Sequence, residues 1–132
     1  MRNPLSPLGG TEMEVLRHVW ALDLATAREV HERISRDRRI AYTTVMTVMK
    51  NLADKGYLAF EQEGTAYVYR AARAPEDVRG SLLGGFLDKV FGGSPLTLVQ
   101  TLARHEALSD AERAEIRRLI DRMGPDPEAD DA

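Results

Sequence analysis

The sequence predicts a mainly α-helical protein of the α+β class, in which three helices and a β-hairpin precede three further helices. Apolar residues recur at helical spacing in six segments along the chain. Two runs rich in β-branched and aromatic residues, 57–62 and 65–70, flank a turn that contains Gly64, which is typical of a hairpin. Because an isolated hairpin is marginally stable in water, we expect it to pack on the first three helices.

Length and composition limit the class of protein. The chain has 132 residues, enough for one domain or two small ones, and no apolar stretch approaches the length of a membrane span. It has no cysteine and no apolar signal segment at its start, so we expect a cytoplasmic protein. The net charge is −3, yet residues 1–75 hold 11 basic and 9 acidic residues, whereas residues 76–132 hold 7 and 12. Either the halves differ in role, or the acidic C-terminal tail alone explains the asymmetry.

Capping motifs and apolar faces define the first three helices. Thr11 and Glu14 form one predicted capping box, and Thr26 and Glu29 form another. The third helix is expected from Tyr42 to about Lys55. Its apolar positions are Val45, Val48, Met49 and Leu52.

The other face of the third helix carries the strongest functional signal. It holds three threonines, which lower helix propensity, together with a lysine and an asparagine. Three helices followed by a hairpin is the order of a winged helix, whose third helix enters the major groove of DNA. Hydroxyls bind bases or phosphates, and neighbouring arginines reach phosphates. The candidate DNA-binding residues are Arg28, Arg38, Arg39, Tyr42, Thr43, Thr44, Thr47, Lys50, Asn51, Gly64 and Thr65. The alternatives are a solvated polar face, or a winged-helix module that binds protein without sequence-specific DNA binding.

The last three helices are expected to form a homodimer. Pro75 opens the first of them, Ser94 and Pro95 the second, and a capping box at Ser109 and Glu112 the third. About 50 residues cannot bury such apolar stripes alone, so they must pack on a second copy or on the N-terminal unit. The candidate dimerisation residues are Leu82, Phe86, Val90, Leu98, Val99, Leu102, Ile116, Leu119 and Ile120.

No pattern in the sequence indicates an enzyme, a metal site or a cofactor. His31 and Glu32 begin a segment that resembles a zinc-protease motif, but Ser35 stands where the second histidine is needed. A half-exposed helical histidine explains His31 as well. Gly80 and Gly85 have the spacing of a phosphate loop without its lysine.

Several segments resemble the penicillinase-repressor (BlaI/MecI) family. The resemblance is carried by residues 8–20, 41–49, 55–58 and 86–93, and it spans about residues 8–123. One departure is Asn51, which stands where members often carry arginine. The copper-responsive branch of the family has a C-terminal cysteine motif, which this chain lacks.

The resemblance implies a dimeric winged-helix repressor of pseudo-palindromic operators with TACA/TGTA-like half-sites, often controlling β-lactamase or related stress genes. Together with the elements predicted above, the resemblance divides the chain into a winged helix-turn-helix DNA-binding domain over residues 1–74, a small three-helix dimerisation domain over 75–123 and, by composition, a disordered acidic tail over 124–132. It also implies a membrane sensor and protease pathway, which in known members ends with cleavage of an Asn–Phe bond. Thr101 and Leu102 occupy that position here, so they form the candidate cleavage site. The alternatives are a sensor protease of altered specificity, or induction without a cut at this bond.

Overall fold

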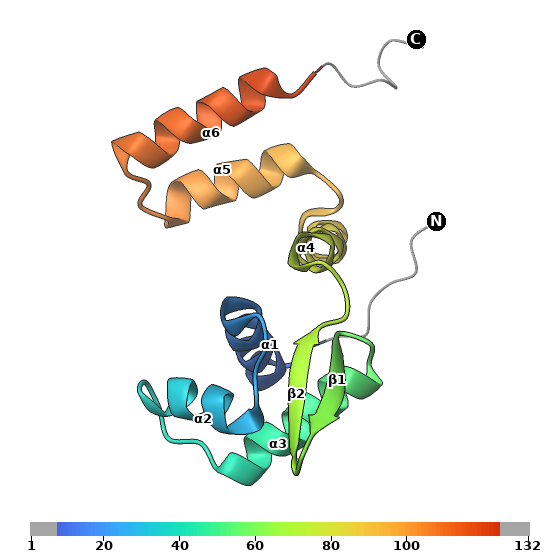
Figure 1. Cartoon of the computed structure of the whole chain (residues 1–132). Coiled ribbons are helices and arrows are strands. Elements are labelled where there is room, and N and C mark those ends of the chain that lie inside the picture. Colours follow the sequence, from blue (N-terminus) through green and yellow to red (C-terminus); the bar gives the residue numbers. More distant parts are fainter. Residues whose placement is uncertain (1–7, 125–132) are drawn as a thin grey trace. The chain divides into compact units, whose positions relative to one another are not determined.

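A computed structural model describes residues 8–124, and it contains the predicted order of elements (Figure 1). The first helices are α1 (Gly10–Leu22), α2 (Ala27–Ser35) and α3 (Tyr42–Asp54). The strands β1 (Leu58–Glu63) and β2 (Ala66–Ala71) follow, and then come α4 (Pro75–Phe91), α5 (Pro95–His105) and α6 (Asp110–Arg122). The expected fold class is therefore confirmed. The expected tail lies, apart from Gly124, outside the described residues.

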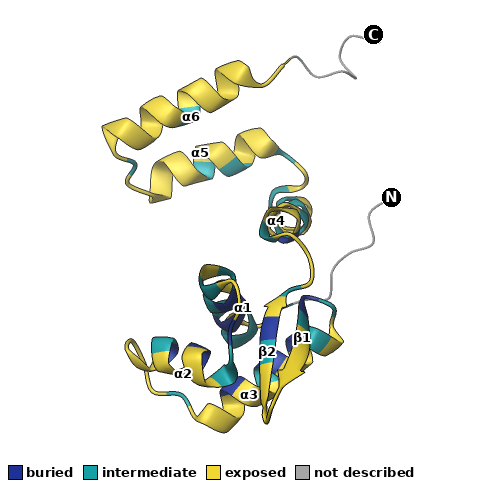
Figure 2. Cartoon of the chain, in the orientation of Figure 1, coloured by how far each residue is buried: buried dark blue, intermediate teal, exposed yellow. Residues whose placement is uncertain are grey.

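The core of the N-terminal part is built from the apolar faces of α1, α2 and α3. Every residue of this core is almost completely shielded from solvent, as the dark-blue segments of Figure 2 show. The helical members of the core are Val15, Leu16, Val19, Val30, Ile34, Val45, Met49, Leu52 and Val78. The apolar spacing in the sequence thus identified the inward faces of the helices correctly.

The chain divides into two compact units, residues 1–86 and 87–132, and the division falls inside α4. Val78 of α4 is 1% exposed within the first core, and Leu82 packs on that core. The start of α4 therefore belongs to the winged-helix unit, although that unit was predicted to end at residue 74. Leu82 was assigned to the dimer surface, but the structure places it against the core of its own chain.

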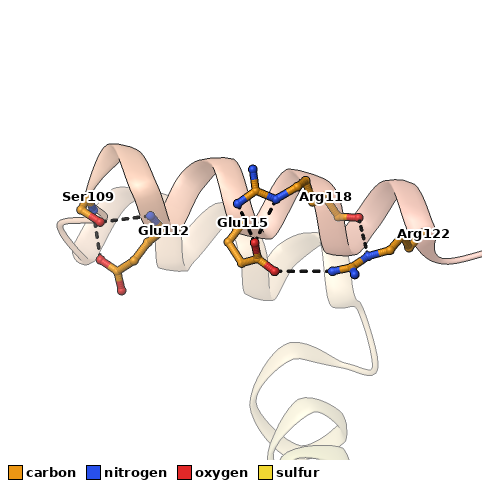
Figure 3. Close-up of polar contacts among 5 residues, drawn as sticks. All are labelled: Ser109, Glu112, Glu115, Arg118 and Arg122. Atoms are coloured by element: carbon orange, nitrogen blue, oxygen red, sulfur yellow. Dashed lines mark hydrogen bonds and ion pairs between the residues drawn. The ribbon is translucent and has the colours of Figure 1, made fainter.

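Two of the three predicted capping boxes are confirmed without change. The backbone N–H of Glu29 donates to Thr26 Oγ1 at 3.2 Å, and that of Glu112 donates to Ser109 Oγ at 3.1 Å. Figure 3 shows the second of these pairs at the start of α6. Ser94 caps α5 in the same way, through the N–H of Thr97 at 3.1 Å.

The predicted capping box at Thr11 and Glu14 is wrong. Helix α1 begins at Gly10, and the N–H of Gly9 donates to Glu12 Oε1 at 3.1 Å. Glu14 is instead held by an arginine that follows α2. The predicted N-cap, Thr11, lies two residues beyond the observed one, Gly9. The Glu14 carboxylate does not cap the helix because it forms an ion pair with a residue distant in the sequence.

A tight turn joins α1 to α2. Asp23 has φ 73° and ψ −62°, and the N–H of Leu24 donates to the carbonyl of Leu22 at 2.9 Å, which makes this a γ-turn with a strained centre. Ala25 then pairs with Tyr69 of β2 through two backbone hydrogen bonds of 2.9 and 2.8 Å. The hairpin is thereby attached to the helices at its base. Its strands pair antiparallel, with Phe60 opposite Tyr69.

The α5 and α6 helices have no buried residue within the described part of the chain (Figure 2). Val99, Leu119 and Ile120 are each about half exposed, while Ile116 and Leu98 are half-buried. The polar side of α6 is occupied by Glu115, which pairs with Arg118 at 2.6 Å and Arg122 at 3.4 Å, as Figure 3 shows. The two helices therefore present apolar residues to solvent.

Candidate nucleic-acid interface

The outward face of α3 carries the predicted polar residues. Val45, Met49 and Leu52 are buried on one side of the helix. The other side is exposed and holds Thr43, Thr44, Thr47, Lys50 and Asn51. The β-branched residues at the start of α3 thus face solvent, where core packing cannot be the reason for their presence.

An open groove of about 880 Å³ lies between α2, α3 and the hairpin. Of the candidate DNA-binding residues, it brings together Arg28, Tyr42, Thr47, Lys50 and Thr65. Its other lining residues are Thr26, Ala27, His31, Glu32, Met46, Ala66, Tyr67 and Tyr69. The remaining candidates do not line the groove; they are Arg38, Arg39, Thr43, Thr44, Asn51 and Gly64.

His31 fixes the entry into α3. Its Nε2 lies 2.9 Å from the carbonyl oxygen of Ile40, which can only accept, so Nε2 carries the hydrogen. The ring also meets Tyr42 edge to face, with centroids 5.7 Å apart. Ala41, the residue before α3, has no side chain that can cap the helix. We infer that His31 positions the first turn of α3, a role that its position in the sequence did not indicate.

Two ion pairs connect the flanks of α3 to α1. Arg38 Nη2 lies 2.8 Å from Glu14 Oε1, and its Nε–H donates to the same oxygen at 3.1 Å. Beyond the other end of α3, Lys55 Nζ lies 2.8 Å from Glu12 Oε2. These hydrogen bonds lower the pKa of the Glu14 and Glu12 carboxyls, with the N–H of Gly9 contributing at Glu12. Arg38 was expected to bind phosphate, but its guanidinium group forms an ion pair with Glu14 of α1.

Three other basic candidates have no such partner. Among the ion pairs of residues 8–124, none involves Arg28, Arg39 or Lys50. All three side chains are exposed, and two of them line the groove. Cations without a counter-ion are suited to a polyanion such as the DNA backbone.

The hairpin, which we call the wing, has an aromatic face. Phe60 meets Tyr67 edge to face with ring centroids 5.2 Å apart, and the ring centroids of Phe60 and Tyr69 are 5.5 Å apart. Tyr69 is buried, whereas Phe60 and Tyr67 are each about half exposed. At the tip, Gly64 has φ 61°, which favours glycine, and Gln62 Nε2 donates to its carbonyl at 3.2 Å. Of the wing, only the tip was predicted from the sequence to bind DNA. Tyr67 was missed, although the alternation of residues 66–70 places it on the same face as Tyr69.

No cluster of three or more side chains suited to metal binding occurs in residues 8–124. No helix within that range has the length and apolar character that a membrane crossing requires.

The comparison with known proteins identifies the family. The sequence model of the penicillinase repressors matches residues 8–122. The chain belongs to the penicillinase-repressor family. It is 35% identical over 127 residues to the transcriptional regulator BlaI of Mycobacterium tuberculosis, covering 96% of this chain and 80% of that protein. It is 24% identical over 122 residues to the methicillin resistance regulatory protein MecI of Staphylococcus aureus, covering 92% of this chain and 99% of that protein.

A solved structure supports the fold of the first unit. The DNA-binding domain of the repressor BlaI superimposes with a TM-score of 0.50 and 25% identity, covering 58% of this chain and 93% of that domain. Both relatives are regulators by name, and the chain shares the fold of the BlaI DNA-binding domain, so the winged-helix interpretation is confirmed. The individual site residues remain predictions.

Proposed function

We propose that this protein is a cytoplasmic transcriptional repressor that binds pseudo-palindromic operator DNA as a homodimer. The observation that carries the proposal is the outward face of α3, where Thr43, Thr47 and Lys50 are exposed beside a groove that also holds Arg28. Family membership supports a role in transcription. The proposed targets are β-lactamase or related stress genes.

The N-terminal half of α3 enters the major groove in this proposal. Thr44 and Thr47 contact base edges, and Thr43 and Lys50 contact phosphates. Arg28 and Arg39 lie on the flanks and add phosphate contacts. The wing tip, Gly64 and Thr65, lies over the backbone or minor groove. Tyr42 and Asn51 contribute at the margins of the same face.

The second unit supplies the dimer contacts, together with Phe86 at the end of the first unit. Within the described residues, α5 and α6 bury nothing, although both have an apolar face. A homodimer covers such faces with two-fold symmetry, which matches the symmetry of a pseudo-palindrome. The proposed contacts are Phe86, Val90, Leu98, Val99, Leu102, Ile116, Leu119 and Ile120.

Binding is tested by fluorescence anisotropy with labelled duplexes from the chain's own promoter region and a scrambled control. We expect tight, salt-sensitive binding to the promoter duplex and weak binding to the scrambled one. Equal, weak binding to both duplexes would instead support a winged-helix module that binds protein.

The dimer is tested with two neighbouring variants on α5. Val99→Glu places a charge on the apolar face, and we expect a monomer in light scattering. Gln100→Glu introduces the same side chain at the next, exposed position and should remain dimeric. A dimeric Val99→Glu protein would exclude this face from the interface.

We further propose that a membrane sensor and protease pathway relieves repression by cutting the Thr101–Leu102 bond. The bond lies inside α5, and the Thr101 hydroxyl donates to the carbonyl of Thr97 at 2.9 Å. Leu102 is 40% exposed in the single chain, and because it is also a proposed dimer contact, the cut requires that it leave the interface before it enters a protease pocket. Because proteases bind extended chains, this part of α5 must unwind before the cut.

A further inference from the structure

Met46 has an exposed apolar side chain on the recognition helix. It is 46% exposed, whereas Met49, one turn further along, is completely buried. Together with Thr47 and Lys50, Met46 lines the groove between α2, α3 and the wing. Met46 is not among the candidate residues predicted from the sequence.

The position of Met46 on α3 makes its exposure informative. Single exposed apolar residues are normal on protein surfaces. Met46, however, lies one helical turn from Thr43 and from Lys50, so it shares the outward face with the residues proposed to contact DNA. It is also in the first half of α3, the part that approaches base edges in helix-turn-helix proteins.

The major groove offers an apolar group that suits such a side chain. The 5-methyl group of thymine projects there, and no other common base carries one. Methionine is long, unbranched and polarizable, so it adapts to a small apolar group between polar contacts. The minor groove presents no equivalent methyl group.

We propose that Met46 packs on the 5-methyl group of a thymine in each half-site and is a specificity-determining residue. This inference rests on the proposed function, because it requires that α3 lies in the major groove. Covering one methyl group with Met46 should change affinity about 4-fold for each half-site.

The test uses the full-length protein and a duplex that it selects from a random-sequence pool. Each thymine of that duplex is replaced in turn by deoxyuridine, which keeps base pairing and removes only the methyl group. We expect one symmetry-related pair of thymines at which deoxyuridine lowers affinity, by about 4-fold at each site. With Met46→Ala, the penalty at that pair should disappear. Thr47→Ala and Lys50→Ala are the matched controls, and they should retain it.

The outcomes separate this proposal from the function on which it rests. The protein could bind a selected duplex specifically, yet show no thymine at which the deoxyuridine penalty depends on Met46. This result would overturn the role of Met46 and leave the repressor function intact. If the deoxyuridine penalty disappears in Thr47→Ala but remains in Met46→Ala, the methyl contact belongs to Thr47. Failure to select any duplex would overturn both proposals. Because Met46 is exposed, Met46→Ala should melt at the wild-type temperature, which excludes misfolding as the cause of any change.

Discussion

Arg38, in the loop before α3, is held by Glu14 of α1 through an ion pair of 2.8 Å, and its Nη2 also lies 3.5 Å from the Thr11 hydroxyl. The side chain of Arg38 is 44% exposed and that of Glu14 is 22% exposed. The pair therefore lies at the surface, and its energetic contribution is reduced by solvent screening. Its geometric effect is clear, because it ties the loop that leads into α3 to the first helix.

Replacing Arg38 should leave the salt dependence of DNA binding unchanged. Each phosphate contact contributes about −0.9 to the slope of log K against log salt concentration. We expect Arg38→Ala to keep the wild-type slope, whereas Lys50→Ala should reduce its magnitude by about 0.9 for each protomer. Anisotropy titrations over a series of salt concentrations measure both slopes.

Charge reversal provides the control for Arg38. If the ion pair positions the loop, Glu14→Arg combined with Arg38→Glu should recover part of the affinity that Arg38→Glu alone loses. A reduced slope in Arg38→Ala, with no recovery in the double variant, would show that Arg38 leaves Glu14 and binds phosphate.

Val78 should make the winged-helix unit depend on the start of α4. The side chain is 1% exposed in the first core, and full burial of a valine contributes about 1.5–3 kcal/mol. We expect a fragment of residues 1–73 to be less stable than a fragment of residues 1–86 by about 2 kcal/mol in urea denaturation. Both fragments lack α5 and α6 and should be monomeric. Equal stability of the two would mean that Val78 adds nothing to the core.

The sequence predicted the elements well because their signals are local. The apolar spacing of α3 and the caps at Thr26 and Ser109 involve residues within one or two turns of each other. These interactions form in almost any tertiary setting, so the pattern alone is sufficient to find them.

Contacts between distant segments could not be predicted in the same way. Glu14 is a plausible capping residue by local spacing, and only the packing of α1 beside the loop before α3 brings Arg38 to it. Met46 lies at the border of the apolar stripe, and its exposure depends on where α2 and the wing sit. Val78 follows a proline that looks like a domain boundary, yet it completes the first core.

His18 should make folding stability depend on pH in the weakly acidic range. Burial and the nearby Arg33 charge lower the pKa of His18 from its ordinary value of 6.5, and the Arg33 Nε–H donates to His18 Nδ1 at 3.1 Å. Below pH 6.5 the unfolded chain binds this proton more readily than the folded one, so stability falls as the pH decreases. The stability is fully present above pH 6.5.

The pH effect is measured by urea denaturation at a series of pH values. His18→Gln keeps an acceptor for Arg33 and removes the titration, so its stability should vary less below pH 6.5. His105→Gln, on exposed α5, is the control and should follow the wild type. Glu12 and Glu14 act in a separate window, since their lowered pKa values cost stability only as the pH falls below 4.5. An unchanged profile in His18→Gln would exclude this histidine as the cause.

Glycine at position 23 should stabilise the protein. The positive φ of Asp23 costs a non-glycine residue about 1–3 kcal/mol, and glycine avoids most of that strain. Glycine also gives the unfolded chain more conformational freedom, which offsets about 0.5–1 kcal/mol of the stability gained by relieving the strain. We expect Asp23→Gly to gain about 1 kcal/mol in denaturation experiments. Asp77→Gly, in the first turn of helix α4, should lose stability instead, because glycine is a poor helix former. A loss of stability in Asp23→Gly would show that the aspartate side chain supports the turn.

The proposed cleavage at Thr101–Leu102 can be followed in cells that express the protein and its sensor. Leucine differs from phenylalanine in a protease pocket by about 1–3 kcal/mol, whereas threonine loses the hydrogen bonds of the asparagine carboxamide. We therefore expect slow cleavage of the wild-type chain after β-lactam treatment, giving a fragment that ends at Thr101 in mass spectrometry. The double variant Thr101→Asn, Leu102→Phe should be cut faster, because it restores the pair of residues found in known members. Gln100→Asn alters a neighbouring exposed residue and should leave the rate unchanged. An intact chain alongside derepressed target genes would mean that this protein is induced without a cut at this bond.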